Sequence, residues 1–128
     1  MIEADVPESA ILNQVTHLTE GLSASERVQW WCRMAESFAE RQHTEGLDLA
    51  LAEALQIASD EMCDLRLAAR IWRLLVELSI RAEAWEYLVE ESLTGVAFAR
   101  MIRDKSLEHL MMDARYRAMI EMGFRPRM

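Results

Sequence analysis

The chain contains few residues that interrupt a helix. It has 4 glycines and 2 prolines in 128 residues, and its β-branched residues are few beside 17 alanines, 16 leucines and 16 glutamates. Alanine, leucine and glutamate lose little side-chain freedom in a helix, whereas valine, isoleucine and threonine lose more. No segment alternates apolar and polar residues for long, which excludes a predicted strand. The composition therefore predicts a single all-α domain over residues 1–128.

The residues and motifs that carry common enzyme chemistry are also scarce. The 4 scattered glycines form no phosphate-binding loop, and no G-x-S-x-G or G-x-G-x-x-G occurs. Residues 40–43 have the E-x-x-H spacing of di-iron bundles, but a second such motif is missing. We interpret His43 as a histidine at a helix end, where it favours the dipole. No catalytic residue, metal ligand or cofactor is predicted, and a metal-binding helical-bundle enzyme is the least favoured alternative.

Charge is unevenly distributed along the chain. The formal net charge is −8, with 13 acids and 3 bases in residues 1–64 but 9 acids and 11 bases in residues 65–128. An acidic domain repels phosphates, so nucleic acid is not an expected partner. The second half suits an acidic partner, and the first half a basic one.

The two cysteines and the first residues indicate the compartment. Cys32 and Cys63 fall within helical patterns without a C-x-x-C motif, and we interpret them as small buried apolar residues in a reducing cytosol. A disulfide between them stays open at this stage. The N-terminus has acids where a signal peptide needs bases. The most apolar run, 65–80, is interrupted by charged residues, so we expect a soluble cytoplasmic protein without a membrane partner.

Apolar spacing and capping residues divide the chain into five to six amphipathic helices. Residues 23–26 have the capping-box form S-x-x-E, Thr44 is a predicted cap of the third helix, and Asp104 caps the sixth, which Gly123 ends. Gly95 is expected to kink or divide the fifth helix. Residues 1–7 and 124–128 are expected to be flexible. The predicted helices are 8–20, 23–42, a third starting at Thr44, 61–79, 82–103 and 104–123.

The fourth predicted helix is apolar on nearly all sides, which predicts a buried central helix. In the fifth, we expect inward-facing side chains from Trp85, Leu88, Val89, Val96, Ala97 and Ile102. The fold is thus a compact helical bundle or an array of helix hairpins.

A short internal similarity supports the second of these architectures. The residues Trp31, Met34, Ala35 and Phe38 correspond to Leu65, Ala68, Ala69 and Trp72 at an offset of 34. Ala50 and Ala54 correspond in the same way to Ala84 and Leu88. Over residues 31–92 this order resembles the helix hairpins of tetratricopeptide (TPR) repeats. The resemblance implies a superhelix that binds a peptide or a partner protein in a concave groove.

Two surfaces are candidates for partner binding. The first is an arginine strip on the fourth helix, formed by Arg66, Arg70 and Arg73 and extended by Arg81; its guanidinium groups suit carboxylates of a partner. The alternative is that the strip is only the solvated face of this helix. In that case Arg73 pairs with Glu77, or the acidic first half of the chain neutralises the strip. The second is the last helix. It has two apolar stripes, of which the second contains the candidate contact residues Met112, Tyr116 and Met119, unless both stripes pack within the chain. Trp30 is a third candidate, as a partly exposed anchor.

The sequence therefore predicts a small acidic helical protein that binds other proteins, such as an adaptor, a chaperone or an inhibitor. A self-assembling homodimeric bundle closed by the last helix is the alternative. The partner is another protein or a second copy of the chain.

Overall fold

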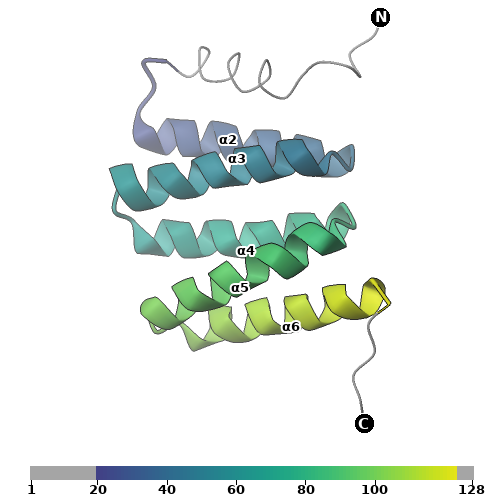
Figure 1. Ribbon diagram of the computed structural model, residues 1–128. Helices are drawn as coiled ribbons and strands as arrows, with labels where there is room; N and C mark the ends of the chain where they lie inside the picture. Colours follow the sequence, from purple (N-terminus) through teal and green to yellow (C-terminus); the bar gives the residue numbers. More distant parts are fainter. Residues whose placement is uncertain (1–19, 124–128) are drawn as a thin grey trace, which may run out of the picture.

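The computed structural model describes residues 20–123 and contains five α-helices joined by short turns (Figure 1). They are α2 (Ala24–Glu40), α3 (Thr44–Gln56), α4 (Leu65–Arg81), α5 (Trp85–Met101) and α6 (Lys105–Glu121), and α3 continues into a π-helical segment, η1 (Ile57–Glu61). No strand occurs within residues 20–123, so the predicted all-α fold is confirmed. The predictions for 1–7, for a helix at 8–20 and for 124–128 concern segments outside the described residues, apart from position 20.

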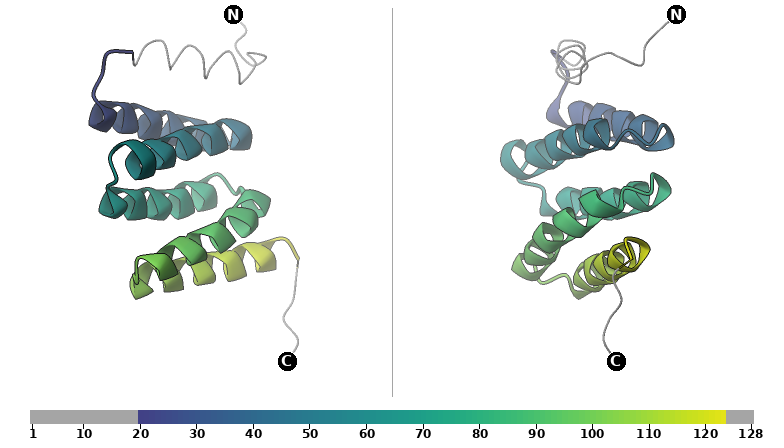
Figure 2. Two further views of the ribbon diagram at one scale, coloured as in Figure 1. Left: turned by 60° about the vertical axis from the view of Figure 1, so that its left-hand side comes forward. Right: turned by 45° about the vertical axis from the view of Figure 1, so that its right-hand side comes forward.

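The helices form two layers. Helices α2, α4 and α6 lie side by side in one layer, and α3 and α5 form the other (Figure 2). The hairpins α2–α3 and α5–α6 are the most closely packed pairs, and α4 lies between them. A compact helical bundle is the result. No helix within residues 20–123 has both the length and the apolar character needed to cross a membrane.

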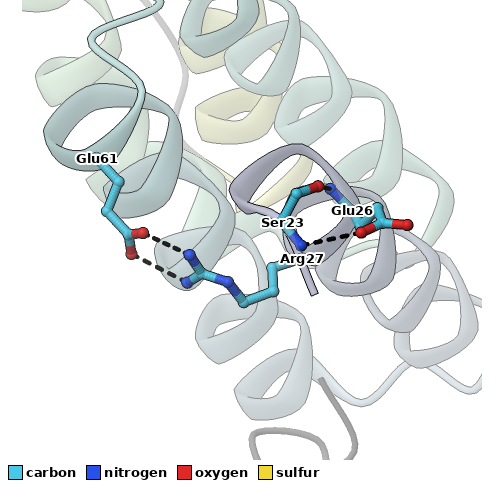
Figure 3. A network of polar contacts seen from close by, with 4 residues as sticks. All are labelled: Ser23, Glu26, Arg27 and Glu61. Carbon is cyan, nitrogen blue, oxygen red and sulfur yellow. Dashed lines mark hydrogen bonds and ion pairs between the residues drawn. The ribbon is translucent and has the colours of Figure 1, made fainter. Parts of the chain in front are cut away.

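Side chains cap most of the helices at their first turn. Ser23 Oγ accepts a hydrogen bond from the Glu26 backbone N–H at 3.2 Å, and Glu26 Oε1 accepts one from the Ser23 N–H at 2.9 Å (Figure 3). This is the predicted capping box. Asp104 caps α6 as predicted, since its Oδ1 accepts from the Leu107 N–H at 3.0 Å. The caps fix where the chain enters each helix.

The predicted cap at Thr44 is wrong. His43 precedes α3, and its Nδ1 accepts a hydrogen bond from the Gly46 N–H at 3.0 Å. The His43 ring also lies 5.2 Å from the Phe38 ring, centre to centre. This contact places the imidazole over the first turn of α3, where it caps the start of the helix. The prediction that His43 favours the dipole at the end of a helix is therefore wrong. Thr44 is the first helical residue.

Two predicted boundaries need correction for the same reason. The fourth helix begins at Leu65, because Cys63 has a φ of 49° and Asp64 is the N-cap, whose Oδ1 accepts from the Leu67 N–H. The fifth runs over Trp85–Met101, because the positive φ of 57° at Glu83 ends the preceding turn. Gly95 lies inside an uninterrupted α5, so the predicted division of this helix is absent there.

Three of the turns share one backbone geometry. The residue two positions beyond each helix end has a left-handed φ, and the next N–H donates to a carbonyl five residues earlier, as in a Schellman motif. These N–H groups belong to His43, Ala84 and Asp104, at 2.8 to 2.9 Å from their acceptors. Each of the three is also the N-cap of the following helix. One helix end and the next helix start are therefore coupled in a three-residue turn.

Helix α4 is the centre of the core, as its composition predicted. It packs against α2, α3, η1, α5 and α6. Its buried residues cover about half of its circumference, so α4 is amphipathic and not apolar on nearly all sides as predicted: they are Ala68, Ala69, Ile71, Trp72, Leu75, Val76, Leu78 and Ser79. One predicted inward residue of α5, Ala97, is instead exposed, because Ser92, Gly95 and Ala99 form the buried face of that helix.

The 34-residue offset does not align equivalent positions of the helices. The N-caps of α2 and α4, Ser23 and Asp64, lie 41 positions apart. Trp31 therefore lies in the middle of α2, whereas Leu65 is the first residue of α4, and Ala84 is a cap. The resemblance to TPR hairpins stays a prediction.

Two helical glycines permit close contacts with bulky side chains. A Cβ at position 46 would overlap the ring of Phe38, and a Cβ at position 95 would overlap the end of Met111. Phe38 and Met111 are both buried. Gly46 thereby allows α2 and α3 to approach, and Gly95 does the same for α5 and α6.

We expect Gly46→Ala to lower the free energy of unfolding by about 1–3 kcal/mol, the usual cost of overpacking against a rigid group. Gly95→Ala is the matched control: it meets the flexible end of Met111, and the helix-propensity gain of about 1 kcal/mol offsets the displacement. Urea unfolding followed by circular dichroism measures both values. Equal losses in the two variants would contradict this assignment.

Candidate partner-binding surface

The arginine strip lies on the outer side of α4. Arg66 and Arg70 are exposed, and neither has an ion pair or side-chain hydrogen bond with any residue of the described part. Arg73 is half-buried, and its Nη2 lies 3.3 Å from Ser106 Oγ and 3.7 Å from Asp104 Oδ2. The strip therefore has two free guanidinium groups and one that is held against the start of α6.

The predicted pairing of Arg73 with Glu77 is wrong. Glu77 pairs with Arg81 at 2.8 Å, one turn further along α4. Arg73 contacts Asp104 instead, because the turn before α6 lies beside it. Within residues 20–64, no carboxylate neutralises the strip, and Glu61 is paired with Arg27 at 3.0 Å (Figure 3).

A groove of about 460 Å³ lies between α2 and α4, next to Arg70. Its lining surface is mostly apolar, and its polar and charged lining residues include Gln29, Asp64 and Arg70. The lining residues are Ser25, Val28, Gln29 and Cys32 of α2, Leu67, Arg70, Ile71 and Leu74 of α4, and Met62 and Asp64 between η1 and α4. A mostly apolar groove with one unpaired guanidinium among its lining residues suits a ligand that is part apolar and part anionic.

A second hollow, of about 620 Å³, lies on the other side of the strip. The first turns of α4 and the turn between α5 and α6 form it, and Leu65 beside it is 45% exposed. Three cationic side chains line it, those of Arg66, Arg103 and Lys105. The positive charge of the α4 strip thus continues to the start of α6.

Helix α6 has one buried and one exposed apolar stripe. Leu107, Met111, Ala114 and Ala118 are buried, whereas Met112 and Tyr116 are 48% and 53% exposed. Met119 is half-buried, and Arg115 Nη1 lies 3.5 Å from its sulfur. Met112 and Tyr116 are therefore not filling the core between two neighbours within residues 20–123.

The structure separates the predicted contact residues into three places. Ser106 faces α4 through Arg73, while Glu108 faces α5 through its ion pair with Arg100 at 2.8 Å. Met112 follows Glu108 by one turn, so it lies about 120° around α6 from Ser106. Trp30 is 37% exposed and does not line the α2–α4 groove. The arginine strip, the exposed stripe of α6 and Trp30 are thus distinct surfaces.

Helix α5 has two exposed apolar residues that the sequence analysis did not identify. Leu93 and Met101 of α5 are 57% and 65% exposed. With Ala97 they follow a four-residue spacing along α5, which is the periodicity that identifies one helix face. Arg100, next to Met101 in sequence, pairs with Glu108, which precedes Met112 by one turn of α6. We call Leu93, Ala97, Met101, Met112 and Tyr116 the hairpin patch.

Both cysteines are free, and Cys63 is exposed, although we predicted it to be buried. It is exposed because it occupies the left-handed turn before α4. Cys32 is half-buried in the wall of the α2–α4 groove. Burial, with a smaller effect of the Glu36 charge, raises the pKa of the Cys32 thiol.

Comparisons with known proteins returned no match among protein-family models, curated proteins or solved structures. Within residues 20–123, no three His, Cys, Asp or Glu side chains converge to hold a metal ion. The imidazole of the E-x-x-H sequence is the α3 cap described above. The surfaces of the chain itself are therefore the basis for a function.

We expect a thiol reagent to modify Cys63 quickly and Cys32 slowly. Cys63→Ser should remove the fast phase. The modification rate of the remaining Cys32 should keep rising above pH 9.0, the ordinary pKa of a thiol, because its raised pKa means that more thiolate still forms above that pH. Stopped-flow absorbance with an aromatic disulfide measures the two phases. A single phase of two equivalents would contradict the burial of Cys32.

Proposed function

We propose that the protein is a small helical module that binds other proteins through the α4 arginine strip and the adjoining α2–α4 groove. The proposal includes no catalytic role, and it places the module in the cytoplasm. The observation that carries it is that Arg66 and Arg70 have no partner in the described part of a chain whose net charge is −8.

Helix α4 gives these arginines a fixed position. The five elements that pack against α4 bury its inner side, so the backbone that carries Arg66 and Arg70 is held in place. On this chain, binding a partner then costs conformational entropy mainly in the side chains of Arg66 and Arg70. Guanidinium groups form bidentate hydrogen bonds with carboxylates, which a solvated lysine does less well.

The groove indicates what kind of segment accompanies the carboxylates. Its mostly apolar lining suits apolar side chains, while Arg70 among the lining residues suits a carboxylate. The occupant we propose is an acidic amphipathic segment of another protein. Steering by the strip and the two further cationic groups of the neighbouring hollow, Arg103 and Lys105, favours such a segment over a basic one.

Arg66→Glu/Arg70→Glu is expected to weaken binding of an acidic amphipathic peptide at least about tenfold, since two favourable charge contacts become repulsive. The probe is a fluorescein-labelled 16-residue peptide of Leu and Glu at helical spacing, measured by anisotropy at low salt. The matched control is Arg41→Glu/Arg117→Glu, which changes the net charge equally at two arginines outside the groove.

If both variants lost affinity for the peptide equally, binding would depend only on the net charge of the chain, which would contradict the proposed site. Protection of Cys32 from thiol modification by the same peptide, in a Cys63→Ser background, gives an independent readout because Cys32 lines the groove. Unchanged modification at saturating peptide would place the contact elsewhere.

A second candidate function is self-assembly through the hairpin patch. Its residues belong to one antiparallel hairpin, and Arg100 and Glu108 place both signs of charge beside it. A second copy related by a two-fold axis would bury the apolar residues of the two hairpins against each other, inside a charged rim.

Light scattering after size exclusion distinguishes the two candidates. Self-assembly predicts twice the chain mass of 14.8 kDa for the unmodified protein. Met112→Lys/Tyr116→Lys should then restore the single-chain mass, because a buried unpaired charge opposes the interface. A mass near 14.8 kDa at high concentration for the unmodified protein would reject self-assembly and leave the groove hypothesis intact.

A further inference from the structure

A third hollow lies at the end of the bundle where α3 and α5 begin and α6 finishes. Its volume is about 590 Å³. The walls come from Thr44, Glu45 and Asp48 of α3, from Glu83 to Tyr87 and Glu90 at the start of α5, and from Met122 after α6. It shares no lining residue with the α2–α4 groove or with the basic hollow. We call it the acidic pocket.

Negative charge in the acidic pocket is not neutralised. Its lining carboxylates have no ion pair within residues 20–123: they are Glu45, Asp48, Glu83, Glu86 and Glu90. Acids in a first turn favour the helix dipole, which accounts for Glu45 and Glu86. Asp48 and Glu90 lie further into their helices, beyond the reach of that effect. The excess of charge there has no ion-pair partner among residues 20–123.

Tyr87 is the second feature of the pocket. It is 8% exposed and lines the pocket, and its hydroxyl has no hydrogen-bond partner among the described residues. Its ring is buried, while its unpartnered hydroxyl is not among the fully buried polar atoms, so a ligand in the pocket can reach it. Burial, followed by the charges of Asp48 and Glu91, raises the pKa of the Tyr87 phenol. Burial and the Asp48 charge likewise raise the pKa of Glu91.

The arrangement favours an organic cation over a metal ion. The carboxylates are spread around the walls, and no three of them converge on one point. A metal ion needs its ligands within one coordination sphere, whereas a guanidinium has five N–H donors that reach acceptors on several sides. Trp85 and Tyr87 add aromatic walls, and Trp85 already has the Arg117 guanidinium 5.5 Å from its ring centre. Flat cations stack on such rings.

We propose that the acidic pocket is a binding site for a guanidinium group, supplied by an arginine side chain. The carboxylates would accept its N–H groups, and the Tyr87 hydroxyl would accept one more. Two sources share this chemistry. One is an arginine of a partner protein. The other is this chain itself, because Arg125 and Arg127 follow in sequence three and five positions after Met122, which lines the pocket.

Titration with acetyl-Arg-Arg-amide, followed by backbone amide chemical shifts in the full chain, tests the site. We expect saturable shifts confined to residues 44–48 and 84–91. Asp48→Asn/Glu86→Gln/Glu90→Gln should weaken binding at least about tenfold, as expected for three lost charge contacts. The control, Glu36→Gln/Glu40→Gln/Asp60→Asn, removes the same charge from exposed positions outside the pocket and should bind within about twofold of the unmodified chain.

Single substitutions keep the test valid if the triple variant unfolds. Tyr87→Phe retains the ring and should weaken binding about threefold or more by removing one hydrogen-bond acceptor for the guanidinium. Glu90→Gln should do so to a similar extent. Equal weakening by the pocket and control triples, shifts spread over the whole chain, or a Mg²⁺ titration with the same shifts and affinity would each overturn the proposal.

Arg125→Ala/Arg127→Ala distinguishes the two sources. If the chain's own arginines occupy the pocket, this variant should bind the probe more tightly, because an intramolecular competitor has been removed. Unchanged affinity assigns the pocket to a partner's arginine. Both results support the guanidinium site, and absence of binding in both forms rejects it.

Discussion

The domain depends on the burial of α4. This helix contacts every other element of the described part, and its apolar side chains fill the space between the hairpins α2–α3 and α5–α6. Without it, the two hairpins would each present an uncovered apolar face. Because burial of apolar area is the main favourable term in folding, the position of α4 determines where the remaining helices pack. The charged residues of α4 are then restricted to its outer strip.

That restriction separates charge of opposite sign within one small chain. Arg66 and Arg70 are held on the outer side of α4, while the carboxylates of the acidic pocket gather where α3 and α5 begin. Neither group is neutralised by the other within residues 20–123. Unpaired surface charge costs little in water, so the fold tolerates both groups, and a partner of complementary charge gains from them. The proposed module would thus present two surfaces of different specificity.

Local signals predicted much of the helical framework. The capping box at Ser23, the cap at Asp104 and the stop at Gly123 follow from hydrogen bonds within four residues of the helix end, which the sequence specifies directly. The cap by His43 was missed because it also depends on the ring of Phe38 in the preceding helix. The left-handed turns at Cys63 and Glu83 were missed because non-glycine residues usually avoid that backbone conformation.

The sequence by itself determined the fold class, the central position of α4 and the exposure of the arginine strip, because each follows from the periodicity and composition of one segment. The tertiary structure decided which charges meet. Arg73 contacts Asp104 and not Glu77, and the α6 stripe and the arginine strip face different directions. It also brought Asp48 of α3 to the acidic pocket with Tyr87 of α5. Such proximity depends on how the helices pack against α4, which no local pattern encodes.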